Sequence, residues 1–183
     1  MSPLIHGIRG LALIPQLDRY MTELQPEIRN TARALIVRQE RVLLLRKFSE
    51  ERGEYFALPG GGQETGETLE QTIARECREE IGTEVALRDL IWVADYFRCR
   101  STQRHLIEMV FLCEVPEHYS PHNGHHPDKH QQEVVWLHRD ELASHRLSEP
   151  YLAEAVAEIL RPDSQSPDPT PTYLGAFHDD PVT

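Results

Sequence analysis

The spacing of apolar residues alternates along the chain between helical and strand-like patterns, and each change predicts the start of a new element. Leu17, Met21 and Leu24 recur at helical spacing after Pro15, which predicts a short helix over residues 16–24. The apolar side of this helix is compatible both with packing on the core and with a homodimer contact.

Runs of β-branched and aliphatic residues, bounded by polar or glycine-containing turns, predict strands. The first two runs flank the turn Arg38-Gln39-Glu40 and predict a hairpin, and the charged stretch 48–55 after them predicts a loop. The predicted extended segments are 31–37, 41–45, 56–58, 84–98, 105–115 and 133–137, with 133–137 as the last strand.

A strongly amphipathic helix is predicted over residues 68–81. Its apolar residues lie four positions apart, at Leu69, Ile73, Cys77 and Ile81. Thr68 and Gln71 have the spacing of a capping box, and Gly82 stands where a left-handed C-terminal cap belongs.

The C-terminal third predicts a helical turn over 140–143 and an amphipathic helix over 148–160, with Ser148 as its cap and Pro150 in its first turn. From Pro162 onward the composition turns to Pro, Asp, Ser and Thr, which is typical of a tail that buries little apolar area. Apolar contacts of 173–177 with the domain are the alternative. We therefore divide the chain into a helical extension (1–29), one α/β domain (30–161) and a tail (162–183).

The net charge of −11, from 30 acidic and 19 basic residues, disfavours broad binding of nucleic acids or anionic membranes. Small anions bridged by a divalent metal remain compatible with it. Three widely spaced cysteines favour a reducing compartment, for which the cytoplasm is our expectation. The N-terminal apolar stretch through Leu13 and Ile14 is broken by Gly7, Arg9, Gly10 and Pro15, so we expect neither a signal peptide nor a transmembrane helix.

Three carboxylates, those of Glu76, Glu79 and Glu80, fall on one face of the helix over 68–81. Like charges at this spacing destabilise a helix, so either neighbouring arginines or a bound cation must compensate them. A solvated acidic face is the plain interpretation. The glycine run 60–62, which lets main-chain groups approach a ligand closely, favours a cation site instead.

The stretch 61–83 resembles the Nudix box. It has Gly61, then five residues, Glu67, then seven residues, then the run Arg75-Glu76-Cys77-Arg78-Glu79-Glu80-Ile81-Gly82-Thr83. Cys77 and Thr83 depart from the larger aliphatic residues of the family, which affects packing and not the charged positions. The resemblance implies a Nudix-type α/β/α sandwich with a mixed β-sheet over 31–160.

The resemblance also implies roles for individual residues. Glu76, Glu79 and Glu80 would bind Mg²⁺, or Mn²⁺ in its place, with the Gly61 carbonyl as a further ligand. Arg75 would orient these carboxylates. Glu67 would steady the loop and helix.

A carboxylate from outside the box usually completes such a site, as a metal ligand or base. Glu133 is our first candidate and Asp128 the second, and for Glu133 an ordinary strand-edge role is the alternative. The implied chemistry is attack of a metal-activated water on one phosphorus of a diphosphate.

Three further groups of residues have both a functional and a plain interpretation. Arg98, Arg100 and Arg104 either hold phosphate or a terminal ribose, or form a solvated hairpin tip. Trp92, Tyr96 and Phe97 either stack on a base or belong to the core. Five histidines lie in a loop that is either a zinc site or simply polar: His118, His122, His125, His126 and His130.

The sequence thus predicts a Mg²⁺-dependent pyrophosphohydrolase acting on a small nucleoside diphosphate derivative, with ADP-ribose or a nucleotide sugar as the favoured substrate. A non-catalytic nucleotide sensor with the same fold is one alternative. A nucleoside triphosphate or RNA 5′-end pyrophosphohydrolase is another, and the charge of −11 disfavours its RNA form.

Overall fold

The computed structural model describes residues 28–99, 103–160 and 172–178. The predicted helix over 16–24 and Arg100 lie outside the described residues. Within these ranges, no helix is long and apolar enough to span a membrane.

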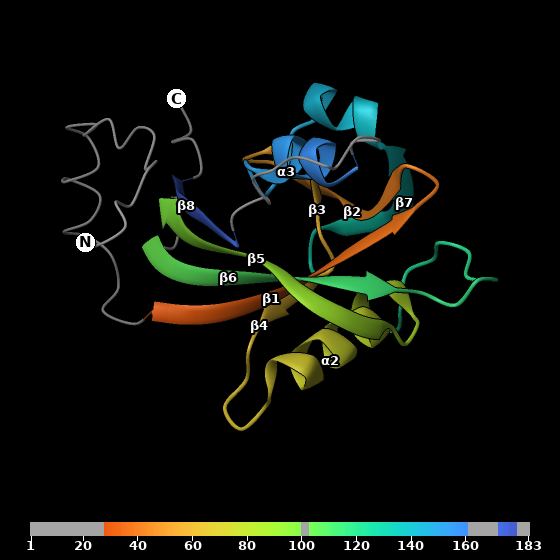
Figure 1. Ribbon diagram of the computed structural model, residues 1–183, viewed down its shortest axis with the longest axis horizontal. Coiled ribbons are helices and arrows are strands. Elements are labelled where there is room, and N and C mark those ends of the chain that lie inside the picture. The colour runs from red at the N-terminus through yellow and green to blue at the C-terminus, as the bar shows by residue number, and fades with distance from the viewer. Residues whose placement is uncertain (1–27, 100–102, 161–171, 179–183) are drawn as a thin grey trace, which may run out of the picture.

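The described chain forms a mixed sheet with two helices and a short 3-10 helix (Figure 1). The elements are β1 (Ile28–Arg38), β2 (Arg41–Ser49), β3 (Gly53–Ala57), β4 (Gly60–Gly62), α2 (Leu69–Ile81), β5 (Ala86–Cys99), β6 (Gln103–Glu114), β7 (Gln131–His138), η1 (Arg139–Ser144), α3 (Leu152–Ile159) and β8 (Tyr173–His178). The strand order is β3-β2-β1-β6-β5-β8, while β4 pairs with β1 and β7 with β2. The pairs β1–β6 and β5–β8 are parallel and the others antiparallel, so the sheet is mixed as predicted.

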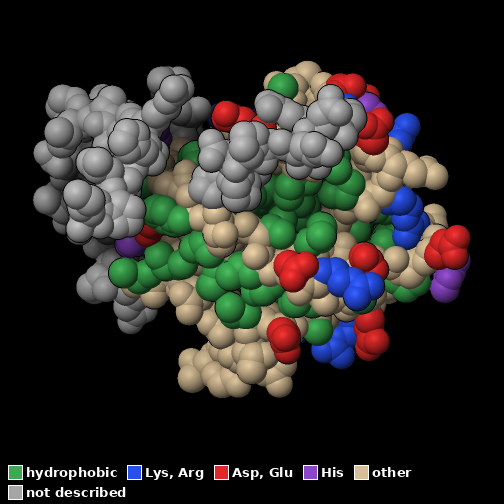
Figure 2. Space-filling model, in the orientation of Figure 1, with side chains coloured by type: hydrophobic (Ala, Val, Ile, Leu, Met, Phe, Trp, Pro, Cys, Tyr) green, Lys and Arg blue, Asp and Glu red, His purple; other side chains and the backbone are tan. Residues whose placement is uncertain are grey.

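Alternation along the strands creates a core on each face of the sheet. The α2-side core contains Ala32, Ala34 and Ile36 of β1, Leu43 and Leu45 of β2, and Ile73, Cys77 and Ile81 of α2. The α3-side core contains Leu35, Val42, Leu44, Trp92, Leu152 and Val156. Figure 1 shows α2 and α3 on opposite sides of the strands, and Figure 2 shows hydrophobic side chains between α3 and β5. The predicted α/β/α sandwich is confirmed.

The predicted first hairpin is confirmed, but the predicted loop over 48–55 is wrong for most of its length. Gln39 and Glu40 adopt positive φ angles of 50° and 60°, which suits a tight turn between twisted strands. Beyond the turn, β2 continues to Ser49 and β3 begins at Gly53. The charges misled the prediction because they lie at the solvent side of paired strands, where Arg46 contacts Glu54.

The caps of α2 are as predicted, whereas that of the last helix is not. Thr68 and Gln71 form the capping box, and Gly82 has a φ of 67°. In contrast, α3 begins at Leu152 without a side-chain cap. The Ser148 N–H donates to the Phe56 carbonyl (2.7 Å) and Leu147 bridges to Phe56, so the chain is still paired with β3 here and the helix begins four residues later.

The expectation that 133–137 is the last strand is also wrong, because β8 follows it and runs parallel to β5. Leu174 and Phe177 of β8 pack against the α3-side core, and the ring centroids of Phe177 and Tyr151 are 5.1 Å apart. Apolar contacts therefore hold 173–178 against the domain, which is the alternative considered for this stretch.

Candidate active site

The glycine strand β4 is fixed on β1, with Gly60 opposite Arg33 and Gly61 opposite Ala32. Gly60 has a φ of 129°, and a Cβ there would overlap the Ala32 carbonyl. Only glycine tolerates both conditions. This strand therefore sets the position of the loop that leads into α2.

Glu80 and Glu76 of α2 contact this glycine strand directly. The Gly60 N–H donates to Glu80 Oε2 (2.8 Å), and Glu80 is only 3% exposed. Burial raises the pKa of Glu80 to about 8, against the lowering effect of the Gly60 hydrogen bond. A Cβ on Gly61 would overlap the Glu76 carboxylate, so this carboxylate packs on the Gly61 backbone. The second contact brings together two predicted metal ligands, and the first holds a third, Glu80, against the same strand.

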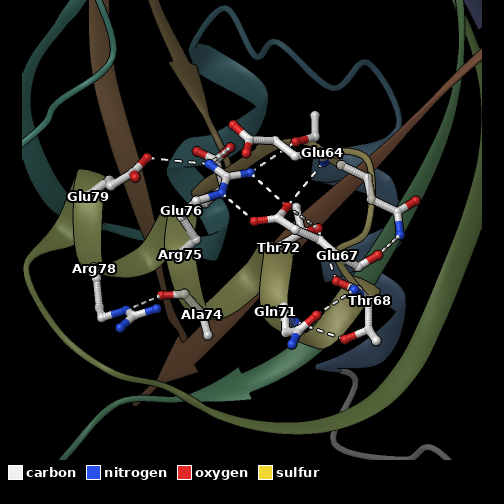
Figure 3. Close-up of polar contacts among 12 residues, drawn as sticks. Glu64, Glu67, Thr68, Gln71, Thr72, Ala74, Arg75, Glu76, Arg78 and Glu79 are labelled. Atoms are coloured by element: carbon white, nitrogen blue, oxygen red, sulfur yellow. Dashed lines mark hydrogen bonds and ion pairs between the residues drawn. The ribbon is translucent and has the colours of Figure 1, made fainter.

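Arg75 compensates the repulsion between the carboxylates, as Figure 3 shows. Its guanidinium donates to Glu67 Oε1 (2.7 Å) and Glu76 Oε1 (2.8 Å), and it lies 3.4 Å from Glu79 Oε2. It also donates to the Gly62 carbonyl (3.1 Å). The hydrogen bond from Arg75 lowers the pKa of Glu67 to about 2. Arg75 thus joins the loop, Glu67 and two predicted ligands.

The donor set suits a hard divalent cation. Its candidates are carboxylate and carbonyl oxygens, and no soft ligand lies among them. Glu76 and Glu79 contact Arg75, while Glu80 lies beneath the glycine strand. In the described ranges, no three His, Cys, Asp or Glu side chains lie close enough together to hold a metal ion. The Gly61 position also suits a divalent cation, because a side chain there would overlap the Glu76 carboxylate.

The two candidates for the outer carboxylate occupy different places. The Glu133 side chain is 52% exposed and pairs with Arg46 (2.9 Å), away from the cavity beside the glycine strand. Asp128 lines that cavity and pairs with Lys47 Nζ. Burial raises the pKa of Asp128, but the Lys47 ammonium outweighs it and the net shift is downward. Of the two candidates, Asp128 lines the cavity and Glu133 does not.

The cavity has a volume of about 660 Å³, and the glycine strand forms part of its wall. Its cationic lining residues are Arg29, Arg33, Lys47, Arg52, Arg98 and Arg104, against the acidic Glu50, Glu51 and Asp128. Cations therefore outnumber acids here by six to three, although the whole chain carries a charge of −11. Such a lining attracts an anionic ligand.

Two of the predicted arginines, Arg98 and Arg104, lie in this cavity, directly opposite each other on β5 and β6. Like charges directly opposite each other destabilise a strand pair. An anion bound between the two guanidinium groups would offset this repulsion. Sequence analysis missed Arg29 on β1, whose guanidinium lies beside Gly62. It also missed Lys47, whose side chain is only 9% exposed. The available signal for Lys47 was its place two residues after the apolar run 42–45.

The structure places the predicted aromatic residues and loop histidines partly in the core and partly at the cavity. Trp92 is 1% exposed in the α3-side core, which confirms the core interpretation for this residue. Tyr96 is buried but lines the cavity, and its hydroxyl donates to the Ser148 carbonyl (3.1 Å). The loop histidines gather no three-residue metal group in the described chain, although His130 lines the cavity.

The family model of the NUDIX domain matches residues 28–159. A nucleoside triphosphatase, NudI, of Enterobacter sp. (strain 638) is 31% identical over 125 residues, which are 62% of this chain and 85% of that protein. An ADP-ribose pyrophosphatase of Methanocaldococcus jannaschii is 31% identical over 99 residues, which are 54% of this chain and 57% of that protein. A Nudix hydrolase structure from Nitrosomonas europaea covers 72% of this chain and 87% of its own, with a TM-score of 0.61 and 22% identity.

Proposed function

Because this chain belongs to the NUDIX family, we propose that it is a Mg²⁺-dependent pyrophosphohydrolase that cleaves the diphosphate link of a small nucleotide. The observation that carries the proposal is the docking of Gly60 and Gly61 on Glu80 and Glu76, next to a cavity lined by cations. Carboxylates that pack on one wall of a cationic cavity repel a phosphate bound there unless a metal lies between them.

We assign the metal to Glu76, Glu79, Glu80 and the Gly61 carbonyl. When bound, it lowers the pKa of a water molecule and neutralises charge on the phosphates. Arg75 holds Glu76 and Glu79 in place through its guanidinium, and Glu67 holds Arg75 in turn. Asp128, at the cavity wall, is the side chain that accepts a proton from the attacking water in this proposal.

Lys47 and three arginines of the cavity, Arg29, Arg98 and Arg104, orient the substrate. Lys47 is held by Asp128, while Arg98, Arg104 and Arg29 come from three adjacent strands. Guanidinium groups bind phosphate oxygens in pairs, so this cluster holds the phosphates beyond the cleaved link or a terminal ribose. Positioning by these groups and charge stabilisation supply most of the rate.

We favour a nucleoside diphosphate derivative such as ADP-ribose or a nucleotide sugar as the substrate. The relative named ADP-ribose pyrophosphatase supports this choice. A nucleoside triphosphate is the second candidate, because the arginine-rich cavity suits a polyanionic chain and another relative is named nucleoside triphosphatase.

A substrate panel tests the proposal: ADP-ribose, a nucleotide sugar and the nucleoside triphosphates, each with Mg²⁺ and with a chelator. Turnover that needs the metal is the expected result. The products should be AMP and ribose 5-phosphate from ADP-ribose, a nucleoside monophosphate and a sugar 1-phosphate from a nucleotide sugar, or a nucleoside monophosphate and pyrophosphate from a triphosphate. Binding of these nucleotides without turnover by any of them would support a sensor. Turnover of 5′-triphosphate RNA alone would point to an RNA 5′-end hydrolase.

A further inference from the structure

Four polar side chains outside the Nudix box are buried together on the α3 side of the sheet. They are Arg33 of β1, Glu108 of β6, and Glu149 and Tyr151 just before α3. Glu108 and Glu149 are each 1% exposed, Tyr151 is 5% exposed, and the Arg33 side chain is 12% exposed. Burial of so many polar groups is costly, and a hydrophobic replacement of similar volume often stabilises a protein. The cluster therefore calls for a role beyond packing.

The contacts within the cluster converge on Arg33. Its Nε donates to Glu108 Oε2 (3.1 Å) and lies 3.7 Å from Glu149 Oε1. The Tyr151 hydroxyl donates to the other oxygen of Glu108 (2.7 Å). Glu149 Oε2 in turn accepts from the Leu58 N–H (3.3 Å), two residues before Gly60. The guanidinium is thus held between two carboxylates in one orientation.

In this orientation Arg33 donates from Nη1 to the carbonyl of Gly60. The Gly60 N–H in turn donates to Glu80 Oε2 (2.8 Å). Arg33 lies between Ala32 and Ala34, which pack in the α2-side core, so alternation places its side chain on the α3 side. Glu80 belongs to α2 on the other side of the sheet. The backbone of Gly60 is therefore the link between the buried cluster and the carboxylates.

We propose that Arg33, fixed by Glu108, Glu149 and Tyr151, is a positioning residue that sets the Gly60 backbone and through it Glu80 and Gly61. The inference rests on the proposed function, because it assumes that Glu76, Glu80 and Gly61 hold the metal. With φ at 129°, Gly60 has a conformation that glycine alone visits readily and that it can also leave readily. A fixed hydrogen bond on each side of Gly60 restricts that freedom before any ligand binds.

The chemistry of Arg33 predicts that lysine does not replace it. A guanidinium offers several N–H groups in a rigid plane, so it can contact Glu108 and Gly60 at once in fixed directions. An ammonium on a flexible stem keeps the positive charge but loses this geometry. The substitution Arg33→Lys therefore separates the orientation of Gly60 from the neutralisation of the buried carboxylates.

Arg38→Lys is the matched control, because Arg38 lies on the same strand and also donates to backbone carbonyls, those of Val115, Pro116 and Glu117. These carbonyls follow β6 and do not contact the glycine strand. Both variants should be compared with the parent by direct Mn²⁺ binding, measured by electron paramagnetic resonance, and by kcat and KM at saturating Mg²⁺. Circular dichroism establishes that each variant is folded.

We expect Arg33→Lys to bind Mn²⁺ at least tenfold more weakly and to lose at least tenfold in kcat, with KM changed less than threefold. Arg38→Lys should keep the parent values within about twofold. Tyr151→Phe, which keeps the ring but releases Glu108, should weaken Mn²⁺ binding by two- to fivefold. Folded Arg33→Lys with parental Mn²⁺ affinity and kcat would overturn the inference and leave the proposed function standing.

If Arg33→Lys does not fold, Tyr151→Phe decides: parental Mn²⁺ affinity in that folded variant overturns the inference. Failure of the proposed function itself gives a different result, because the parent protein would then bind no Mn²⁺ and turn over no nucleotide. Weakened Mn²⁺ binding in Arg33→Lys together with parental binding in Arg38→Lys supports the assignment.

Discussion

The Gly60 N–H donates to the Glu80 carboxylate over 2.8 Å, and this contact joins the glycine strand to the acidic helix. The two residues are 20 positions apart, and each lies in a different element. Because Glu80 is buried beneath the glycine strand, it differs from an ordinary solvated glutamate in both its pKa and its accessibility. Several predictions depend on this difference.

Glu80→Gln should lower kcat by at least tenfold at saturating Mg²⁺, because loss of one metal ligand removes transition-state stabilisation. Glu70→Gln is the matched control, since Glu70 lies in the same helix and is exposed. It should leave kcat within about twofold of the parent. If Glu80→Gln kept more than about a tenth of the parent kcat, we would abandon the metal role of Glu80.

Asp128→Asn and Glu133→Gln distinguish the two outer carboxylates. Asp128 lines the cavity, whereas Glu133 pairs with Arg46 on a more exposed part of β7. General-base catalysis typically contributes about 10²–10⁴-fold. We expect kcat, measured across a pH–rate profile, to fall within this range for Asp128→Asn and by less than about threefold for Glu133→Gln. A larger loss of kcat for Glu133→Gln than for Asp128→Asn would assign the role of general base to Glu133.

Arg104→Met should raise KM by about tenfold and change kcat little, because Arg104 is proposed to hold the part of the substrate beyond the cleaved bond. Arg78→Met serves as the control, since Arg78 is exposed, donates to the Ala74 carbonyl of its own helix and does not line the cavity beside the glycine strand. The measurement is initial rate against substrate concentration at two ionic strengths. Equal KM values for both variants would remove Arg104 from the binding site.

Removal of all residues after Arg161 should lower the free energy of unfolding, because it deletes β8 with Leu174 and Phe177. Loss of these half-buried side chains costs about 2–4 kcal/mol in total. A truncation after His178, which keeps β8, is the control and should unfold like the parent. The free energy of unfolding of each chain is measured by urea titration, with circular dichroism as the signal. Equal stability of both truncations would mean that β8 contributes nothing.

The pKa of Glu80, about 8 in the folded chain against 4.5 as its ordinary value, predicts a pH-dependent stability without metal. Below pH 4.5 both folded and unfolded chains are protonated, so the contribution to stability is fully present. As the pH rises toward 8, only the unfolded chain loses the proton, and stability falls by up to about 1.4 kcal/mol per pH unit.

The comparison with Glu80→Gln isolates this contribution, because Glu149, whose pKa is also raised by burial, is present in both proteins. In a chelator, the variant should gain stability relative to the parent between pH 5 and 8, measured by urea unfolding. A constant difference between the two proteins over this range would show that Glu80 does not titrate there.

The sequence by itself determined those features that depend on neighbours in the chain. Thr68, Gln71 and Gly82 specify the ends of α2 through contacts within a few residues, and alternation along β1 and β2 specifies which side chains face each core. The spacing from Gly61 to Glu80 fixed the family in the same way, because the box is a local pattern.

Only the tertiary structure decided which of these residues meet. It placed Asp128 at the cavity and Glu133 outside it, although Asp128 lies just before β7 and Glu133 within it. It joined Arg33 to Gly60, 27 residues away, and Glu108 to Tyr151, 43 residues away. Such pairs carry no local signal, because a buried arginine is stable only where the fold brings carboxylates and carbonyls from other elements around it.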